Sequence, residues 1–439
     1  MSSLGDAAYA ATADRAATQW GLFTTRDAER AGADAMMLRR WQRRGAIIRR
    51  AQGLYRIAGV PVDPTLDPLR AAWLTIAARH GGDTTAVVIS HLSAAVAHGL
   101  LPAAPGEPVD VSVNRPHRTR STGIALHHAP TLTADAVTAI NGLPVTSIAR
   151  TVADLRRAGL PADRLDAIAR AAVELGRSPG PSIVANSSSP VIVHVPHAGT
   201  HIPPAVRRDL LLDDHDLAAE LEEATDWATD RIARGAASRA LSAPSLVLNP
   251  FSRLVIDPER FPDADPADQV GRGAVYTRTC RGFPLRAPSA EHRQALLAEY
   301  FTPHAAAMHE LVTAALAEHG HAVVLDLHSY PLTPSGFEEP AASRPQVCLG
   351  TDDFHTPPAL TAAARGLFSD AGYSVEINTP YAGCYIPLEH YRAADRRVTG
   401  LMIEIRRDVY RPGGELDSPA VDRLGELVAE LVTMAATPP

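Results

Sequence analysis

The sequence predicts a C-terminal α/β domain with a mostly parallel or mixed sheet, preceded by an α+β N-terminal region that opens with a winged-helix pattern. Three observations predict this arrangement. Apolar strands alternate with helices in the C-terminal half, helices precede a short hairpin near the N-terminus, and residues 176–190 are rich in Gly, Pro and Ser. A chain of 439 residues is also too long for one ordinary core.

These features divide the chain into four expected segments. They are a winged-helix domain over residues 1–60, an α+β domain over 61–176, a linker over 177–190 and an α/β domain over 191–439. Charge follows a similar division: residues 1–180 hold 21 arginines against 15 acids, a net of +6, and the remaining residues hold 21 arginines against 34 acids, a net of −13. Halves of opposite sign favour two domains with different partners.

The composition argues against membrane and secreted proteins. No apolar run reaches the roughly 18–20 residues that cross a bilayer, and the first residues, which include Asp6 and Asp14, lack the apolar core of a secretory signal. The three cysteines, Cys280, Cys348 and Cys384, are too few and too widely spaced for a disulfide framework or a CxxC metal site. We therefore expect a cytoplasmic protein.

The N-terminal half contains helical and strand patterns in the order of a winged helix. The expected elements are helices over 8–20, 25–31 and 35–44, a hairpin over 46–59 with its turn at Gln52-Gly53, a short strand and helix over 87–100, strands over 109–114 and 123–129, and helices from 147 to 175.

The C-terminal half alternates strands with helices. The expected elements are strands over 191–199, 245–257 (with a break), 321–330, 374–380 and 400–410, and helices over 217–234, 289–319, 357–371 and 419–436.

Ionisable side chains lie at or near the ends of several of these strands. His197 and His328 each follow an apolar run, and Glu404 lies inside one. Ligands of α/β sheets bind beyond the carboxyl ends of the strands, where such side chains would meet. Strand alternation places Asp326 on the same face as His328, where it could orient a ligand histidine. Taken singly, each histidine is more often only hydrogen-bonded, and Glu404 could equally pair with Arg406.

Long motifs in this half resemble the N-formylglutamate amidohydrolase family. The matching segments are VPHAGTHIP, EEATDWATDRI, FSRLVIDPERFPD, GRGAVYTRT, VLDLHSYP, RPQVCLGTDDFHTP, NTPYAGCYIP and GLMIEIRRDVY. That family is similar to the zinc carboxypeptidase and aspartoacylase group. The resemblance implies a zinc-carboxypeptidase-like α/β/α domain, a bound Zn²⁺ and hydrolysis of the amide bond of an N-acyl amino acid such as N-formylglutamate.

The resemblance also implies roles for particular residues. His197 and His328 are the expected zinc-binding histidines. The carboxypeptidase group uses HxxE, but Thr200 stands at the acid's position, so the acid should come from the following helix. Asp226 is our choice, with Glu222 and Glu223 as the alternatives.

The expected catalytic groups are an acid and an arginine. Glu404 is the expected general base, which activates the zinc-bound water and then protonates the leaving amine. Arg253 is the expected stabiliser of the oxyanion, and Arg260 the expected clamp for a substrate carboxylate.

One departure concerns the substrate. Enzymes of the aspartoacylase type read DLNR where this chain reads Asp257-Pro258-Glu259-Arg260. A charged Glu259 in place of Asn leaves a different N-acyl amino acid, or a small peptide-like amide, open as the substrate. Further candidate pocket residues are Arg278, Tyr381 and Arg407, although Tyr381 in PYAG is equally well explained as a turn residue.

Arginines cluster in the expected winged helix. Besides Arg56, which adjoins them, the candidate DNA-binding residues are Arg39, Arg40, Arg43, Arg44, Arg49 and Arg50. For a random helix such a cluster is more often a solvated face. Here, RRGAIIRRAQGLYR followed by SHLSAAVAHGL resembles AbiEi-type antitoxins over about residues 20–175. The resemblance implies DNA binding, transcriptional autoregulation and a nucleotidyltransferase toxin as partner.

Three functional hypotheses remain open from the sequence. The first is a hydrolase with a DNA-binding regulatory module. The second is an antitoxin-like regulator whose hydrolase-like domain only senses a ligand, and the third is an intact hydrolase fused to a vestigial winged helix.

His91 and His98 are seven residues apart and therefore share a helical face. Structural hydrogen bonding explains this pair better than zinc binding does.

Overall fold

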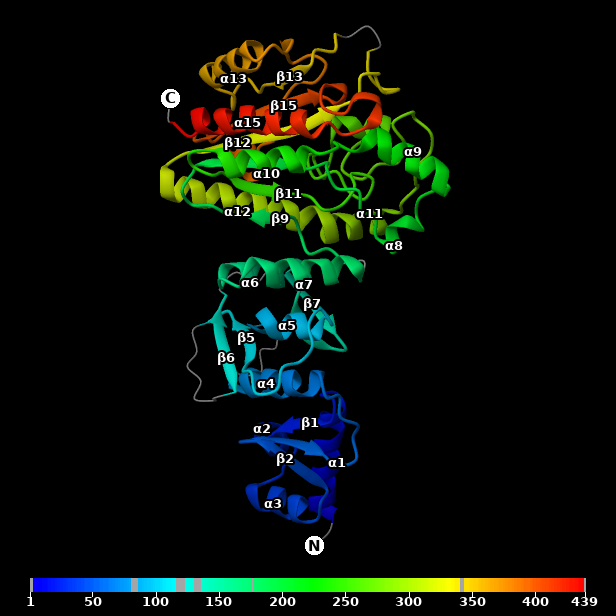
Figure 1. Ribbon diagram of the computed structural model, residues 1–439. Helices are drawn as coiled ribbons and strands as arrows, with labels where there is room; N and C mark the ends of the chain where they lie inside the picture. Colours follow the sequence, from blue (N-terminus) through cyan, green and yellow to red (C-terminus); the bar gives the residue numbers. More distant parts are fainter. Residues whose placement is uncertain are drawn as a thin grey trace. The chain divides into compact units, whose positions relative to one another are not determined.

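The computed structural model describes residues 3–79, 86–115, 123–129, 136–175, 177–339 and 343–437. The chain forms two compact units, Met1–Leu175 and Gly176–Pro439 (Figure 1). Within the described ranges, every helix is too short or too polar to cross a bilayer. Each unit is built around its own sheet or sheets.

The first unit begins with three helices and a small antiparallel sheet of order β1-β3-β2. Its elements are α1 (Ser3–Ala17), β1 (Leu22–Thr24), α2 (Thr25–Arg30), α3 (Ala35–Arg43), β2 (Ile47–Ala51) and β3 (Leu54–Ile57). Thr24 and Asp34 cap α2 and α3 by accepting hydrogen bonds from backbone N–H groups of the first turn. Leu38 and Trp41 are the buried side of α3. The helices and the hairpin expected here are confirmed, with shifts of a few residues at their ends.

The rest of the first unit surrounds a five-stranded sheet of order β6-β5-β4-β8-β7. Its elements are α4 (Leu66–Arg79), β4 (Val87–Ile89), α5 (His91–Ala97), β5 (Val109–Val113), β6 (Ile124–His128), β7 (Val137–Ile140), β8 (Leu143–Thr146), α6 (Ile148–Arg157) and α7 (Ala162–Glu174). The hairpin of β7 and β8 and helix α4 are not among the expected elements. Leu22 and Leu54 share one apolar cluster with Leu66 and Trp73, so the packing continues across the expected boundary at residue 60.

The second unit contains a seven-stranded mixed sheet of order β14-β13-β15-β12-β10-β11-β9. The strands are β9 (Ser182–Val184), β10 (Val191–Val195), β11 (Ser245–Leu248), β12 (Ala322–Tyr330), β13 (Val347–Gly350), β14 (Val375–Ile377) and β15 (Val398–Arg406). The four central strands, β11, β10, β12 and β15, are parallel, whereas β9 and β13 run antiparallel to their central neighbours. The expected mixed α/β sheet is confirmed.

Helices cover both faces of this sheet (Figure 1). The longer ones are α9 (Asp214–Ala224), α10 (Thr229–Arg239), α11 (Ala290–Leu296), α12 (Thr302–His319), α13 (Pro358–Asp370) and α15 (Ser418–Ala435), with the short helices α8 (Pro204–Arg207) and α14 (Leu388–Arg392) in connections. One face packs on α10, α13 and α15, and the other on α12. Alternation along β12 sends Leu325 and Leu327 into the first layer, and Val324 and His328 toward the α12 side. A π-helical turn over Leu297–Phe301 joins α11 to α12.

Two expectations about this unit are wrong. The single helix over 217–234 is two helices, because residues 225–228 leave the helical path and Ala228 takes a left-handed φ of 59°. The expected linker over 177–190 contains β9, which pairs with β11 as an edge strand of the sheet. Its apolar run, Ile183-Val184, is too short to stand out from the Gly, Pro and Ser residues around it.

Candidate metal centre and active site

Two histidines and one carboxylate meet at the carboxyl end of the parallel strands. His197 lies just after β10, His328 on β12, and Asp226 in the break between α9 and α10. The two Nδ1 atoms are 3.2 Å apart, and Asp226 Oδ2 lies 3.1 Å from His328 Nδ1 and 3.6 Å from His197 Nδ1. All three side chains are buried. The structure therefore brings together the three residues expected to bind a metal, from segments far apart in the chain.

The opposite nitrogens of the two imidazoles contact other carboxylates. His197 Nε2 lies 2.8 Å from Asp257 Oδ1, and His328 Nε2 lies 3.0 Å from Asp326 Oδ1. The contact of His197 with Asp257 is a hydrogen bond, which keeps the hydrogen on Nε2 of His197, whereas His328 Nε2 meets Asp326 only at an ion-pair distance. Asp326 is the residue expected to orient a ligand histidine. Asp257 was not expected in this role. Its position directly after the apolar run of residues 254–256 is a signal that the sequence could offer.

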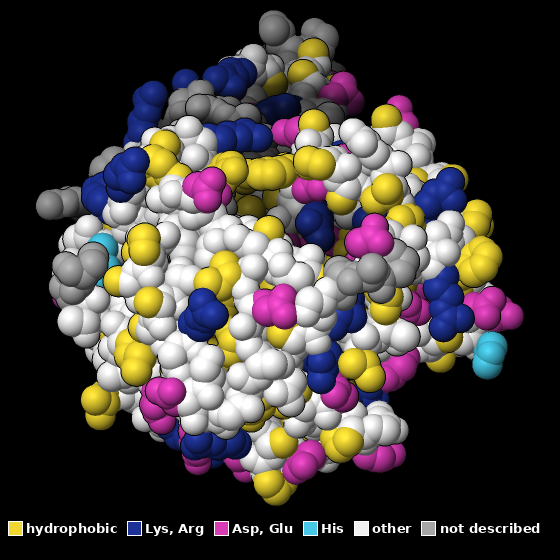
Figure 2. Space-filling view, turned by 90° about the horizontal axis from the view of Figure 1, so that it is seen from above, with side chains coloured by type: hydrophobic (Ala, Val, Ile, Leu, Met, Phe, Trp, Pro, Cys, Tyr) yellow, Lys and Arg dark blue, Asp and Glu magenta, His cyan; other side chains and the backbone are white. Residues whose placement is uncertain are grey.

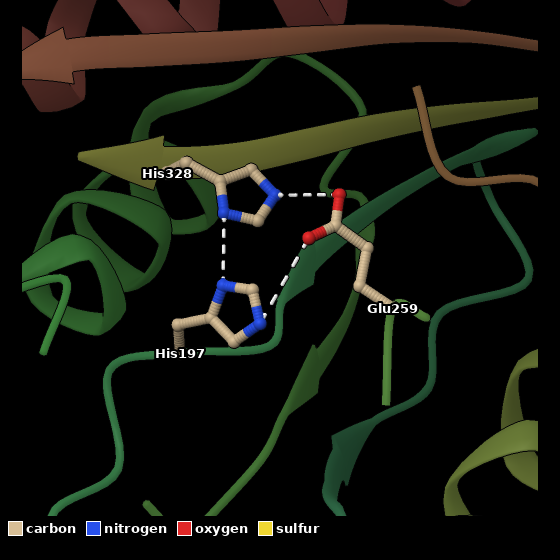
Figure 3. A group of neighbouring side chains, drawn as sticks. All are labelled: His197, Glu259 and His328. Carbon is tan, nitrogen blue, oxygen red and sulfur yellow. Dashed lines mark hydrogen bonds and ion pairs between the residues drawn. The ribbon is translucent and has the colours of Figure 1, made fainter. Parts of the chain in front are cut away.

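The carboxylate of Glu259 is a third one on the Nε2 side, and it lies between the two Nε2 atoms (Figure 3). Its oxygens are 3.8 Å from His197 Nε2 and 3.5 Å from His328 Nε2, and these three residues form a second group that could hold a metal ion. Burial, with Asp326 and Asp257 nearby, raises the pKa of Glu259 to about 7. The same pair of histidines thus has two sides on which a metal ion could be held, one with Asp226 and one with Glu259.

Spacing favours the Asp226 side, whereas both sides of the histidines have competing contacts, with Arg253 Nη2 at Nδ1 of His197. Ligands about 2.0–2.1 Å from a tetrahedral metal lie roughly 3.3 Å apart, close to the separations on the Nδ1 side. The Nε2 atoms are already in contact with Asp257 and Asp326 at 2.8 and 3.0 Å, shorter than either distance to Glu259.

The break between α9 and α10 places Asp226. Asp226 N–H donates to the carbonyl of His197, which ties the two metal-side segments together. The alternatives Glu222 and Glu223 stay on α9, where they form ion pairs with Arg411 and Arg281. The unexpected interruption of the helix therefore has a structural consequence, since it turns the carboxylate of Asp226 toward the two histidines.

Gly199 allows the His197 loop to approach its neighbour closely. A Cβ atom at this position would lie 2.6 Å from the carbonyl oxygens of Asn249 and Phe251. A glycine is therefore required for this close approach, because any side chain would clash with the backbone of residues 249–251.

Glu404 lies on β15 in register with His328. It is 9% exposed, and its Oε2 atom has no hydrogen-bond partner within the described part of the chain. Burial raises the pKa of Glu404 to about 8; Asp226 and Glu259 add to the increase, while His328 and Arg253 oppose it. The acid expected to act as general base therefore belongs to the same electrostatic cluster as the two histidines.

Arg253 also reaches the Nδ1 side. Its Nη2 contacts His197 Nδ1 and lies 3.7 Å from Asp226 Oδ2. Arg260, expected as the carboxylate clamp, has its Nε 3.8 Å from Asp257 Oδ2, and its side chain is 40% exposed. Burial opposes the charge of Arg260, but Asp257 and Glu259 raise its pKa above the ordinary value. Arg260 therefore remains cationic beside the cluster.

The other candidate pocket residues have different placements. Arg278 is exposed and donates to the carbonyl of Gly282. Tyr381 donates to Glu338 at 2.9 Å, and its ring meets that of Tyr330 edge-on. Burial raises the pKa of Tyr381, and electrostatic interaction with Glu404 adds to the increase, so Tyr381 is near the cluster.

Arg407 is buried, and its placement differs from the substrate-binding role expected for it. Its guanidinium donates to the carbonyls of Glu222, Glu223 and Ser329, and it lies 3.4 Å from Asp226 Oδ1. The first two carbonyls belong to the end of α9, where the helix leaves acceptors unpaired. Arg407 therefore stabilises the end of α9 and contacts the Oδ1 atom of Asp226, whereas the two histidines face its Oδ2 atom.

The N-terminal arginine face is open to solvent. Its members lie on α3, on the following turn and on β2, and all six are exposed: Arg39, Arg40, Arg43, Arg44, Arg49 and Arg50. Arg56 instead is buried and pairs with Asp67 at 2.5 Å.

His91 and His98, which were expected to share a helical face, have separate partners. His98 Nε2 lies within hydrogen-bond distance of the carbonyl of Thr146, whereas the ring of His91 stacks on that of His127.

The face drawn in Figure 2 has a mixed surface. Acidic and basic side chains are interspersed on it, and a hollow there is bordered by hydrophobic side chains. Because the chain contains no lysine, every basic side chain in this view is an arginine.

Comparisons with known proteins agree with both halves of the chain. A family model described as N-formylglutamate amidohydrolase matches residues 189–411, and one described as transcriptional regulator, AbiEi antitoxin, matches residues 11–58. The AbiEi match stops well before residue 175, so the wider resemblance stays a prediction.

Curated relatives match the second unit. N-formylglutamate deformylase of Pseudomonas aeruginosa is 31% identical over 229 residues, which are 50% of this chain and 82% of that protein. The enzyme of the same name from Pseudomonas putida is 28% identical over 229 residues, covering 50% and 81%. A crystal structure of N-formylglutamate amidohydrolase from Ralstonia eutropha JMP134 covers 58% of this chain and 97% of that chain, at 24% identity and a TM-score of 0.48. On the family model and the curated relatives, the chain belongs to the N-formylglutamate amidohydrolase family.

Proposed function

We propose that the second unit is a zinc-dependent amidohydrolase, with the metal bound by His197, His328 and Asp226. The observation that carries the proposal is the spacing of 3.1–3.6 Å among the two Nδ1 atoms and Asp226 Oδ2. Nitrogen and carboxylate oxygen are donors that suit zinc, and three protein ligands leave a position for water or substrate. The zinc-carboxypeptidase-like fold remains a prediction, compatible with the helix-covered mixed sheet.

The chain's own groups fit hydrolysis of an amide. A bound zinc ion would supply a Lewis acid that polarises the carbonyl and lowers the pKa of water. Glu404 is the general base: it takes a proton from water and delivers it to the leaving nitrogen. Arg253 donates to the oxygen that gains charge, and Arg260 binds a carboxylate of the substrate.

The proposed substrate class is an N-acyl amino acid. N-formylglutamate is the first candidate, because the curated relatives are named N-formylglutamate deformylase. Glu259 and Arg260 are neighbours in the chain, and a charged Glu259 would repel a substrate carboxylate bound by Arg260. Arg278 and Tyr381 are the further candidate pocket residues.

Zinc content and turnover test this proposal together. We expect about one zinc per chain in the purified protein, chelator-sensitive release of formate from N-formylglutamate or of the corresponding carboxylic acid from a related N-acyl amino acid, and loss of both in His328→Ala. Absence of stoichiometric metal from the wild type would end the hydrolase interpretation. Full zinc occupancy without turnover on a panel of N-formyl and N-acetyl amino acids would instead support the alternative in which this unit only senses a ligand.

The two possible acids can be separated by matched variants. Asp226→Asn should lower zinc affinity strongly, while Glu259→Gln should retain zinc. The reverse result would place the metal on the Nε2 side of the histidines and would overturn the assignment of Asp226.

For the first unit we propose DNA binding by a winged helix, with α3 as the recognition helix. The AbiEi match over residues 11–58 and the exposed arginine face support this. The expected regulatory role and a toxin partner extend from the same match. A gel-shift assay on the DNA upstream of the gene tests it: the wild type should bind, and a variant with arginines 39, 40, 43 and 44 changed to alanine should not. Equal binding by both would remove the interface, and no binding by either would favour a vestigial module.

A further inference from the structure

A row of three buried imidazoles and one carboxylate extends away from the candidate metal centre. His304, on the first turn of α12, has its Nε2 atom 2.8 Å from Nε2 of His194 on β10. His194 Nδ1 lies 2.8 Å from Asp326 Oδ1, and the same oxygen lies 3.0 Å from His328 Nε2. All four side chains are buried to within 2% exposure. The row therefore links helix α12 to a metal-side histidine through two neighbouring strands.

The register of the sheet explains this alignment. His194 on β10 and Asp326 on β12 are direct partners in the parallel pairing, and Asp326 and His328 are two residues apart on one strand. All three thus point to the α12 side of the sheet, where Ile192 and Val324 pack on that helix.

The contacts determine where the hydrogens lie. An ionised carboxylate only accepts, so His194 Nδ1–H donates to Asp326, and in the tautomer that carries its single hydrogen on Nδ1 the Nε2 atom is the acceptor. His304 Nε2–H is the remaining donor for that contact. Burial lowers the pKa of His304 well below the ordinary value, in agreement with a neutral ring. Tyr385 N–H donates to the second oxygen of Asp326 at 3.2 Å.

We propose that His304 and His194 are positioning residues for the metal centre. They hold the Asp326 carboxylate 3.0 Å from His328 Nε2, where its negative charge favours a hydrogen on Nε2 and leaves the Nδ1 lone pair for the metal. This inference rests on the proposed function, in which zinc is bound through Nδ1. Outer partners of metal-binding histidines typically change metal affinity by about 10–100-fold.

The test measures zinc affinity by chelator competition on the full-length protein. His304→Met and His194→Met remove the donors, whereas His304→Gln retains an N–H that can reach His194. The matched control is His355→Met, because His355 is equally buried but contacts the carbonyl of Val398 instead. We expect affinity to fall by about 10–100-fold in the first two variants, and by less than about threefold in His304→Gln and in the control.

The outcomes separate this inference from the proposed function. A wild type without zinc would defeat the proposed function itself. A wild type that binds zinc, with His304→Met binding it as tightly, would overturn only the positioning role. If the methionine variants do not fold, a neutron crystal structure of the zinc-loaded wild type decides: hydrogen on His304 Nε2 and His194 Nδ1 agrees with the proposal, and hydrogen on His304 Nδ1 with none on Nε2 contradicts it.

Discussion

The two charged clusters of this chain are built in opposite ways. The arginine face of the first unit is exposed on α3 and β2. The histidines and carboxylates of the second unit are instead buried near the carboxyl ends of the central strands. Exposed charges attract a polyanion with little cost and are weakened by salt. Buried charges must be paired or held in place, and their pKa values move as a result. The first cluster suits binding, and the second suits chemistry.

Replacing the expected general base should have the largest effect on the buried cluster. Glu404→Gln keeps the shape of the side chain but cannot accept the proton from water. We expect kcat to fall by about 10²–10⁴-fold with zinc content unchanged. Steady-state kinetics and metal analysis on the same sample check this. Loss of zinc in this variant would show that Glu404 acts on the metal site and not on the proton.

Removing the carboxylate behind His197 should have a smaller effect. Asp257→Asn leaves a neutral group 2.8 Å from His197 Nε2, so the ring's hydrogen and orientation are less firmly held. We expect zinc affinity to fall by about 10–100-fold. Asp265→Asn is a suitable control, because Asp265 caps a short 3₁₀ helix and contacts neither histidine. An unchanged affinity in Asp257→Asn would remove Asp257 from the centre.

Charge removal on the exposed face should leave hydrolysis unchanged. If the six arginines bind phosphates, replacing four of them by alanine should reduce the slope of log affinity against log salt by roughly 0.9 for each phosphate that is no longer neutralised. Binding isotherms at several salt concentrations measure this slope. A fall in kcat of the same variant would contradict the separation of the two clusters.

The pH dependence of stability should separate the clusters further. In the metal-free protein the folded-state pKa values of Glu404, about 8, and Glu259, about 7, lie above the ordinary glutamate pKa of 4.5. Between the ordinary and the raised values the folded state binds more protons than the unfolded state, so stability falls as pH rises from about 5 to about 8. Thermal unfolding with chelator present measures this, and Glu404→Gln should flatten the dependence. Parallel curves for the variant and the wild type would contradict it.

Much of the sheet and the metal-side histidines could be predicted from the sequence. Apolar strands such as β10, β12 and β15 are evident from composition, and His197, His328 and Glu404 follow from their positions along them. Asp226 follows only from the family resemblance, since no local pattern shows that the helix around it is interrupted.

The remaining features depend on tertiary contacts that no local pattern contains. The role of Arg407 depends on carbonyls of α9, including that of Glu222, which lies 185 positions earlier in the chain. The place of Glu259 between the two Nε2 atoms depends on a loop, and β9 becomes a strand only because β11 offers it an edge.

Anomalous diffraction at the zinc absorption edge is the most direct test of the central claim. The account predicts one peak bounded by His197 Nδ1, His328 Nδ1 and Asp226 Oδ2, with Asp257 and Asp326 on the far sides of the two rings. A peak among Glu259 and the Nε2 atoms, or no peak in protein purified without chelator, would contradict it.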